Sequence, residues 1–409
     1  MLFYDILYLS MKKERRVKKR HTFFMNLIKI LLRPFAFFVW GYRYHSRYKI
    51  KKGEKVLVLS NHQTDFDPLI IHLSFNKLLH TLATDNIFKK GIANWFLKGM
   101  GCIPKRKGLV DFKSVMEMNA VLKEGGNVLF FPEGNRTYAE FQYYINPKIG
   151  QFVKASGATL ILFNIHGGTG KYPRFKNKAR RGKFYGEIKK VLTPDEYKDM
   201  SDEELYKIIR DNLRVFDSDS GNLYKSSRRA EYMERMFFVC PVCGKAEMLH
   251  SHKQYIHCDN CGLKVEYTED MRLKSDDQRF KYSRLIEWYE YQKRWILELR
   301  PKPGEVIFED KHVVLHTSEP GKRKILLSRG SLKITPHEFI FRDVRFPISE
   351  IEIASAISGR KIGFTCRGKA YEARGGKRFN PLKYVFLFNK LETKMKINKT
   401  DNYFTLGDE

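Results

Sequence analysis

Two pairs of closely spaced cysteines constrain the fold of this chain more than any other feature. The segment CPVCGK contains Cys240 and Cys243, and the segment CDNCGL contains Cys258 and Cys261. Each C-x-x-C-G turn can direct two thiolates at one ion, and four thiolates suit tetrahedral Zn²⁺ without leaving an open position. The spacing therefore predicts a small structural zinc ribbon over residues 236–268, in preference to an iron site or a redox dithiol.

The use of cysteine and histidine around these pairs supports a metal site. The chain has six cysteines, and most of them lie in the two pairs, which is a metal-binding pattern and not a disulfide framework. This pattern indicates a reducing compartment. His250, His252 and His257 lie close to the pairs in sequence. Because four thiolates already fill the coordination shell, we expect these histidines to be neighbours of the metal and not ligands.

A regular alternation of apolar runs and helix-like stretches extends from about residue 45 to residue 190. The strand-like runs are KVLVLS (55–60), NVLFF (127–131) and TLILFNI (159–165). Stretches of helical spacing lie between them, over 67–79, 89–100 and 112–125. This alternation predicts an α/β domain in which helices flank a central sheet.

The chain changes character twice after the cysteine pairs. Residues 269–300 carry a stripe of aromatic residues among many charges, which predicts a linker helix whose stripe packs into a core. From residue 301 short strand-like runs are separated by glycine, proline and charged turns, and a helix-like segment begins after Asn380 and Pro381. We expect a mainly-β domain that looks like a pleckstrin-homology-like (PH-like) or GRAM-like barrel.

The first part of the chain combines a basic cluster with an apolar segment. Residues 12–20 are mostly lysine and arginine, and residues 22–42 are apolar and aromatic apart from Lys29, Arg33 and Pro34. A spanning helix requires roughly 20 uninterrupted apolar residues, so this segment fits an interfacial or re-entrant helix better. Together with the net charge of +30, it predicts a peripheral or monotopic protein on the cytoplasmic face of a phospholipid membrane. The alternative is an ordinary core helix with a basic tail.

The predicted organisation has five parts. They are a basic, amphipathic, membrane-associating N-terminus (1–44), the α/β domain (45–222), the zinc ribbon (236–268), the linker helix (269–300) and the mainly-β domain (301–409).

The stretch SNHQTDFDPL follows the first strand-like run and places His62 and Asp67 in an H-x4-D pattern. Pro68 disfavours a helical conformation at Asp67, which suits Asp67 as the N-cap of a helix that begins at Pro68. If the chain turns there, Asp67 could accept a hydrogen bond from one imidazole nitrogen and leave the other free as a base. The motif alone leaves two interpretations open, a simple helix cap and a catalytic pair.

Two further segments supply cationic groups. In LFFPEGNRT a strand-like run stops at Pro132, and Glu133, Gly134 and Arg136 follow in a tight turn. Sites in α/β sheets gather at the carboxyl ends of strands, and a guanidinium presents a planar fork that suits phosphate or carboxylate. In GCIPKRKG, Arg106 is the centre of a basic triplet, which on its own is an ordinary solvated surface.

Taken in order, these segments resemble the glycerolipid acyltransferase family, which includes 1-acylglycerol-3-phosphate acyltransferase. The resemblance covers roughly residues 45–215. The matching positions are Asn61, His62 and Asp67 in NHQTDFD, Arg106 in GCIPKRKG, and residues 131–137 in FPEGNRT. The resemblance implies that His62 deprotonates the acceptor hydroxyl, which attacks an acyl thioester, and that Asp67 orients His62. The catalytic-pair interpretation is therefore favoured.

The resemblance also implies a binding site for the acceptor. Arg106 and Arg136 would hold its phosphate, and Glu133, with Gly134 in the same turn, would help to fix the glycerol part. The implied activity acylates 1-acyl-sn-glycerol 3-phosphate (lysophosphatidic acid) to phosphatidic acid in phospholipid biosynthesis, with acyl-CoA or acyl carrier protein (ACP) as donor.

Two alternatives to this activity stay open. One is an acyltransferase for glycerol 3-phosphate or another lysophospholipid. The other is a non-catalytic adaptor, stapled by zinc, that binds lipid or nucleic acid. The intact motif residues favour the enzyme, and a nucleic-acid partner is not expected.

Overall fold

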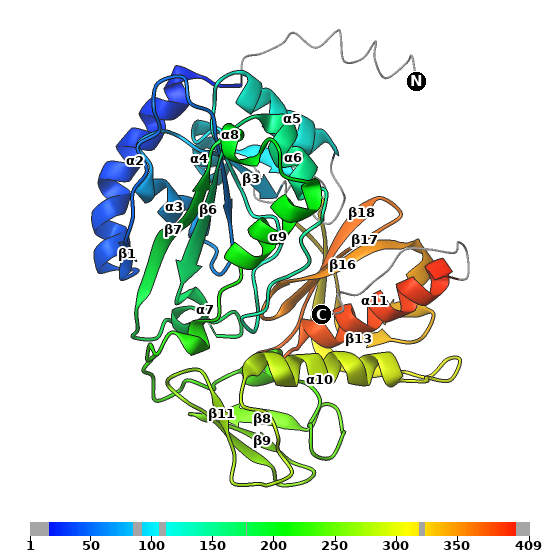
Figure 1. Ribbon diagram of the computed structural model, residues 1–409. Helices are drawn as coiled ribbons and strands as arrows, with labels where there is room; N and C mark the ends of the chain where they lie inside the picture. Colours follow the sequence, from blue (N-terminus) through cyan, green and yellow to red (C-terminus); the bar gives the residue numbers. More distant parts are fainter. Residues whose placement is uncertain (1–15, 85–91, 106–111, 177, 319–323, 398–409) are drawn as a thin grey trace.

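The fold is built on three β-sheets (Figure 1). The computed structural model describes residues 16–84, 92–105, 112–176, 178–318 and 324–397. In these residues the first sheet has seven strands, the second has four and the third has seven. In Figure 1 the first sheet is blue to green, the second is yellow-green and the third is orange.

The first sheet has the strand order β1-β7-β6-β2-β5-β3-β4 and confirms the predicted α/β domain. Neighbouring strands pair in parallel except β6 and β7, which are antiparallel, so β1 and β7 run opposite to the other five. The predicted apolar runs form β2, β5 and β6, whereas β1, β3, β4 and β7 were not predicted. The bounds are β1 (Tyr42–Tyr44), β2 (Val56–Ser60), β3 (His80–Thr84), β4 (Ile103–Lys105), β5 (Val128–Phe130), β6 (Thr159–His166) and β7 (Phe184–Leu192).

Helices cover both faces of this sheet, because successive residues of β2 point to opposite sides. Val56 and Val58 share a buried cluster with residues of α2 and α3. Leu57 and Leu59 share another cluster with residues of α5, α6 and α9. The helices are α2 (Lys19–Phe38), α3 (Asp67–Ile71), α4 (Ile92–Gly99), α5 (Phe112–Lys123), α6 (Ile149–Ser156), α7 (Gly168–Lys171), α8 (Pro194–Tyr197) and α9 (Asp202–Asn212).

The helix expected over residues 67–79 is shorter than predicted. Helix α3 ends at Ile71, a 3₁₀ turn follows over His72–Ser74, and β3 begins at His80. The imidazole of His72 contacts the carbonyl oxygens of Pro68, within α3, and of Leu79 (2.9 Å), beyond the turn. These contacts close a compact turn where the periodicity indicated a continuing helix.

Helix α2 is apolar on both sides: Met25, Leu32 and Ala36 are buried, and other large apolar side chains are exposed. Its buried side chains include His21 and Lys29, and the Lys29 amine donates to the carbonyl of Phe75 at 3.0 Å. Burial lowers the pKa of Lys29 to about 8. The exposed side chains include Phe23, Leu27, Ile30, Leu31 and Phe38. None of the helices in the described residues has the length and apolar character needed to cross a membrane.

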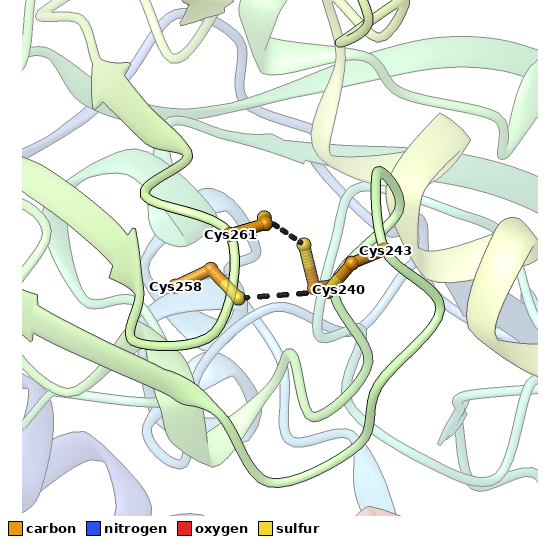
Figure 2. A group of neighbouring side chains, drawn as sticks. All are labelled: Cys240, Cys243, Cys258 and Cys261. Atoms are coloured by element: carbon orange, nitrogen blue, oxygen red, sulfur yellow. Dashed lines mark hydrogen bonds between the residues drawn. The ribbon is translucent and has the colours of Figure 1, made fainter.

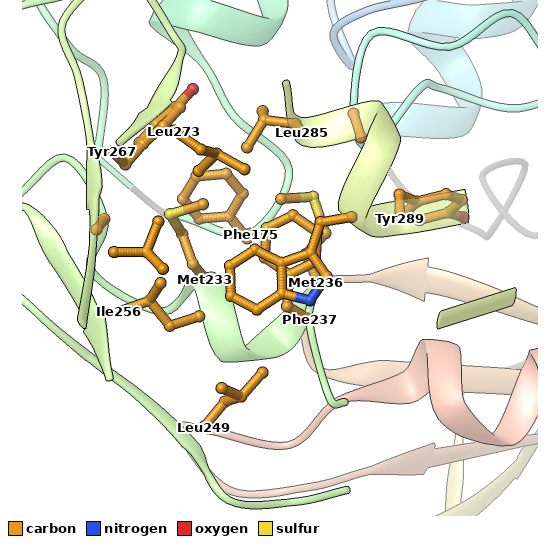
Figure 3. Close-up of a cluster of buried hydrophobic side chains, with 14 of the residues drawn as sticks. Phe175, Met233, Met236, Phe237, Leu249, Ile256, Tyr267, Leu273, Leu285 and Tyr289 are labelled. Carbon is orange, nitrogen blue, oxygen red and sulfur yellow. The ribbon is translucent and has the colours of Figure 1, made fainter. Parts of the chain in front are cut away.

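The cysteine-containing region folds as a small antiparallel sheet that shares its core with its neighbours (Figure 3). Its strands are β8 (Leu249–His252), β9 (Tyr255–Cys258), β10 (Lys264–Tyr267) and β11 (Leu273–Lys274). The core also receives Phe175 from the α/β domain and Tyr289 from helix α10 (Leu285–Glu298). Because β11 pairs with β10, the helix expected over 269–300 starts only at Leu285, and its aromatic stripe is core as expected.

The third sheet has the order β15-β14-β13-β12-β18-β17-β16 and is antiparallel throughout. The mainly-β character and the terminal helix α11 (Pro381–Ile397) agree with the prediction, and Asn380 Oδ1 accepts from the Leu382 N–H at 2.8 Å. The closed barrel is not seen, because the edge strands β15 and β16 do not pair in the described residues. The strands are β12 (Phe308–Ser318), β13 (Ile325–Ile334), β14 (Glu338–Phe341), β15 (Val344–Pro347), β16 (Ile351–Ser358), β17 (Lys361–Cys366) and β18 (Lys369–Arg374).

Candidate active site

His62 and Asp67 meet in the loop between β2 and α3. Nδ1 of His62 lies 2.8 Å from Oδ2 of Asp67. The same carboxylate accepts the backbone N–H groups of Gln63 (2.6 Å) and Thr64 (2.9 Å), and the Thr64 hydroxyl. Asp67 was predicted to be the N-cap of this helix, but the N-cap is Phe66 and Asp67 is the first residue of α3. Its side chain is fully buried. The loop therefore fixes the acid that orients the imidazole.

This arrangement leaves the second imidazole nitrogen of His62 available as a base. A carboxylate beside Nδ1 favours the tautomer that carries its proton there, so that Nε2 keeps its lone pair. The His62 ring stacks on Phe131 with 4.3 Å between centroids, and its side chain is 19% exposed. The imidazole is thus held in orientation and remains accessible.

The turn after β5 lies against this loop. The backbone N–H of Thr137 donates to the carbonyl of His62 at 3.0 Å, which joins the two motifs directly. Gly134 adopts a left-handed conformation with φ of 67°, a region that favours glycine. A small hollow between the two segments is lined by His62, Glu133 and Thr137, among others.

Glu133 anchors this turn to the following loop. Its carboxylate accepts the backbone N–H of Tyr143 at 3.0 Å. Burial raises the pKa of Glu133 to about 8, although backbone N–H groups of Tyr143 and His62 act in the opposite direction. The side chain is nearly buried, which favours a role in holding the turn.

Arg136 is held at the edge of the same turn by an exposed acid. Its Nη1 lies 3.0 Å from Oδ2 of Asp65, and the two side chains are 15% and 81% exposed, respectively. Burial lowers the pKa of Arg136, and the neighbouring Arg174 adds to this effect. Asp65 therefore occupies the position at which an anionic ligand would meet the guanidinium.

The structure brings five of the sequence-predicted residues together: His62, Asp67, Glu133, Gly134 and Arg136. They lie just beyond the carboxyl ends of β2 and β5, which are adjacent parallel strands. Arg106 lies outside the described residues.

The supporting residues Gln63 and Thr64 were not predicted. Gln63 Oε1 accepts the N–H of Gly168 at 2.7 Å, a contact distant in sequence. The only local signal was Thr64, three residues before Asp67, a spacing that permits a side chain to backbone turn.

Comparison with known proteins identifies the domain that carries these loops. Residues 41–166 match the family model described as Acyltransferase, a range that contains both motifs. This part of the chain is an acyltransferase domain. The predicted family is thereby confirmed for the domain.

One solved structure to which the chain is similar is the 1-acyl-sn-glycerophosphate acyltransferase PlsC from Thermotoga maritima. It is 20% identical, and the alignment covers 52% of this chain and 86% of that chain with a TM-score of 0.42. No curated protein sequence matches the chain significantly.

Beyond the acyltransferase domain, the four paired cysteines converge as their spacing predicted (Figure 2). The sulfur atoms of Cys240 and Cys261 lie 3.6 Å apart, those of Cys243 and Cys258 lie 3.8 Å apart, and all four lie within 4.8 Å of one another. A tetrahedral ion with Zn–S bonds of about 2.3 Å requires S···S distances of about 3.8 Å. The cluster therefore has the geometry of a four-thiolate metal site.

The backbone of each cysteine pair turns tightly, as the glycines predicted. Gly244 and Gly262 have φ of 68° and 72°, and their N–H groups donate to the carbonyls of Cys240 and Cys258. The nearby His250 contacts Asp259 at 2.9 Å and is not part of the cluster.

Proposed function

We propose that the acyltransferase domain moves a fatty acyl group from acyl-CoA or acyl-ACP to the free hydroxyl of 1-acyl-sn-glycerol 3-phosphate. The product is phosphatidic acid, an intermediate of phospholipid biosynthesis. The observation that carries the proposal is the His62–Asp67 pair, joined through Thr137 to the turn that bears Arg136. This places a positioned base within one site with a cation suited to the acceptor phosphate.

The proposed reaction needs no nucleophile from the protein. Nε2 of His62 removes the proton of the acceptor hydroxyl, whose oxygen attacks the thioester carbonyl. The new ester bond forms as the C–S bond breaks, and the leaving thiolate takes the proton from the His62 imidazolium, which restores the neutral base. Asp67 keeps His62 oriented and stabilises the imidazolium that forms. The chain's own contribution is therefore base catalysis and orientation.

Replacement of Arg136 by alanine is expected to raise the KM for lysophosphatidic acid by about tenfold or more, with a smaller effect on kcat. A charge-assisted contact to phosphate contributes about 1.5–3 kcal/mol, and roughly 1.4 kcal/mol corresponds to a factor of ten. Steady-state kinetics with varied acceptor concentration measure this effect. A KM equal to that of the wild type would remove Arg136 from the acceptor site.

Asp65→Asn is the matched variant, because it removes the acid that pairs with Arg136. Asp65 is largely exposed and competes with the acceptor phosphate for the guanidinium. We expect the KM for lysophosphatidic acid to fall by a factor of about two or three, as suits a weak surface pair. A rise in KM would show that Asp65 supports binding.

The identity of the acceptor is tested by thiol release from a defined acyl-CoA. Purified protein is assayed with lysophosphatidic acid, glycerol 3-phosphate and lysophosphatidylcholine, and the lipid product is identified by mass spectrometry. We expect turnover with the first and little with the others. Faster turnover with glycerol 3-phosphate would favour the alternative acyltransferase. Salt-sensitive nucleic-acid binding without turnover would favour the adaptor.

We propose that the four-cysteine cluster holds Zn²⁺ in a structural role. Cys240, Cys243, Cys258 and Cys261 would complete the coordination shell, which leaves no open position for chemistry. The S···S distances support this assignment.

We propose that helix α2 binds the cytoplasmic face of a phospholipid membrane. The outward apolar side chains support this, since burial of each contributes about 1.5–3 kcal/mol. The net charge of +30 adds attraction to anionic lipid. In this arrangement the acyltransferase domain, which packs on the inner side of α2, stays at the bilayer surface.

The double variant Ile30→Glu/Leu31→Glu is expected to weaken binding to vesicles of phosphatidylglycerol and phosphatidylcholine by at least about tenfold. Both side chains are exposed on α2, so the folded structure should persist. Vesicle flotation measures the bound fraction. Leu297→Glu, at an exposed apolar position on α10, is the matched control and should bind like the wild type. Unchanged flotation of the double variant would contradict the proposed membrane face.

A further inference from the structure

Arg174 links the active-site turn to the third sheet. It lies between α7 and β7, outside both acyltransferase motifs. Its Nη1 donates to the carbonyl of Arg136 at 2.7 Å, and its Nη2 donates to the carbonyl of Ala356, in β16, at 2.5 Å. One guanidinium thus bridges the backbone of the acceptor-binding turn and the backbone of the C-terminal sheet.

The surroundings of Arg174 make this bridge specific. The guanidinium lies over the ring of Tyr138, with 3.9 Å to the centroid, so the same turn is held at a second point. Across the described parts of the chain, no carboxylate lies within salt-bridge distance of Arg174. The planar fork of arginine suits two carbonyls at once, whereas the single ammonium of lysine does not preserve that geometry.

The C-terminal sheet also packs against the backbone of Arg174, through Gly359. A Cβ added to Gly359, in the turn between β16 and β17, would lie 3.0 Å from the carbonyl oxygen of Arg174. Nearby, the guanidinium of Arg235 donates to the carbonyls of Phe175 (2.9 Å) and Lys377 (2.7 Å). The backbone at residues 174–175 is therefore fixed by contacts from the region before the ribbon and from the C-terminal sheet.

We propose that Arg174 is a positioning residue through which the C-terminal sheet completes the acceptor-phosphate site. The sheet holds Arg174 through Ala356 and Gly359, and Arg174 holds the backbone of Arg136, whose side chain meets the phosphate. This inference rests on the proposed function. It assigns the C-terminal sheet an indirect part in substrate binding, exerted through Arg174, in addition to any ligand of its own.

The first test is Arg174→Lys. We expect the KM for 1-oleoylglycerol 3-phosphate in detergent micelles to rise about tenfold, with kcat changed by less than about threefold. A purely structural role would lower kcat and Tm together and leave KM unchanged, and that result would overturn the proposal. His62→Ala is then added both to the wild type and to Arg174→Lys, so that lipid binding can be measured by fluorescence without turnover. We expect the affinity for this lipid to be about tenfold weaker in the protein that carries Arg174→Lys.

The second test perturbs the contact from the C-terminal sheet alone. Gly359→Val places a side chain against the Arg174 carbonyl, and Gly376→Val, at a position with open space, is the control. We expect the Gly359 variant to raise the KM severalfold and the control to match the wild type. Equal KM values for the two variants, with both folded, would overturn the link.

The two failures can be told apart. Turnover retained by His62→Ala would remove the proposed function. A normal affinity for 1-oleoylglycerol 3-phosphate in Arg174→Lys would remove only the positioning role.

Discussion

Replacement of His62 by alanine is expected to lower kcat by roughly 10²- to 10⁴-fold while the protein stays folded. The loop after β2 orients the imidazole through Asp67, whose buried carboxylate lies 2.8 Å from Nδ1. The same carboxylate accepts the backbone N–H groups of Gln63 and Thr64. Alanine removes the base and leaves those backbone contacts in place. Thiol release from acyl-CoA, followed with lysophosphatidic acid as acceptor, measures the loss.

The control for this variant is His250→Ala. His250 also lies beside a carboxylate, at 2.9 Å from Asp259, but it belongs to the small cysteine-containing sheet. It should retain the wild-type kcat. Asp67→Asn is a poorer test, because Asp67 also secures the loop and its loss would alter local structure. Turnover by His62→Ala close to that of the wild type would exclude His62 as the base.

Removal of metal from the four-cysteine cluster is expected to unfold the small sheet and to lower Tm sharply. Structural zinc contributes about 10–16 kcal/mol to small domains of this type, which is comparable to the whole stability of a typical domain, about 5–15 kcal/mol. Cys258→Ser should produce the same result as a strong chelator. Elemental analysis of the metal, together with thermal melting in the presence and absence of chelator, measures both effects.

The control is Cys366→Ser, a buried cysteine of β17 outside the cluster. It should keep the metal content of the wild type. The damage in Cys258→Ser should extend beyond the small sheet, because Phe175 of the acyltransferase domain and Tyr289 of α10 share its core. A stable, metal-free protein with an unchanged melting curve would contradict a structural role.

The central strands of the acyltransferase domain were predictable because they are continuously apolar. Strand β2 is buried along its whole length, and the sequence shows this as a short continuous run of apolar residues. Strand β7 was missed because Glu187, Lys189 and Lys190 interrupt its apolar residues, and both lysines are exposed. The helix expected over 67–79 was shortened by contacts of His72 that no periodicity reveals.

In the candidate site, contacts between residues close in sequence could be predicted, and contacts between distant residues could not. His62 and Asp67 lie within one short loop, so their spacing was visible in the sequence. Glu133 could be located, but its partner, the Tyr143 N–H, depends on the path of the following loop. Arg174 gave no signal, because its partners are main-chain carbonyls of residues 136 and 356, which any residue type can supply.

Lys29 has a different place in the structure from the one that the sequence suggested. In the sequence it interrupts an apolar segment and so argues against a spanning helix. In the structure it points inward to the carbonyl of Phe75, so it does not separate the exposed apolar side chains of α2.

Membrane binding through the exposed face of α2, as proposed above, would change how the rate depends on the acceptor. Held to a bilayer by α2, the enzyme would meet a lipid acceptor by lateral diffusion in two dimensions. The variable that sets its rate is then the mole fraction of acceptor in the surface, and not the amount per volume of solution. Diluting the acceptor with neutral lipid, at constant total acceptor, should slow turnover.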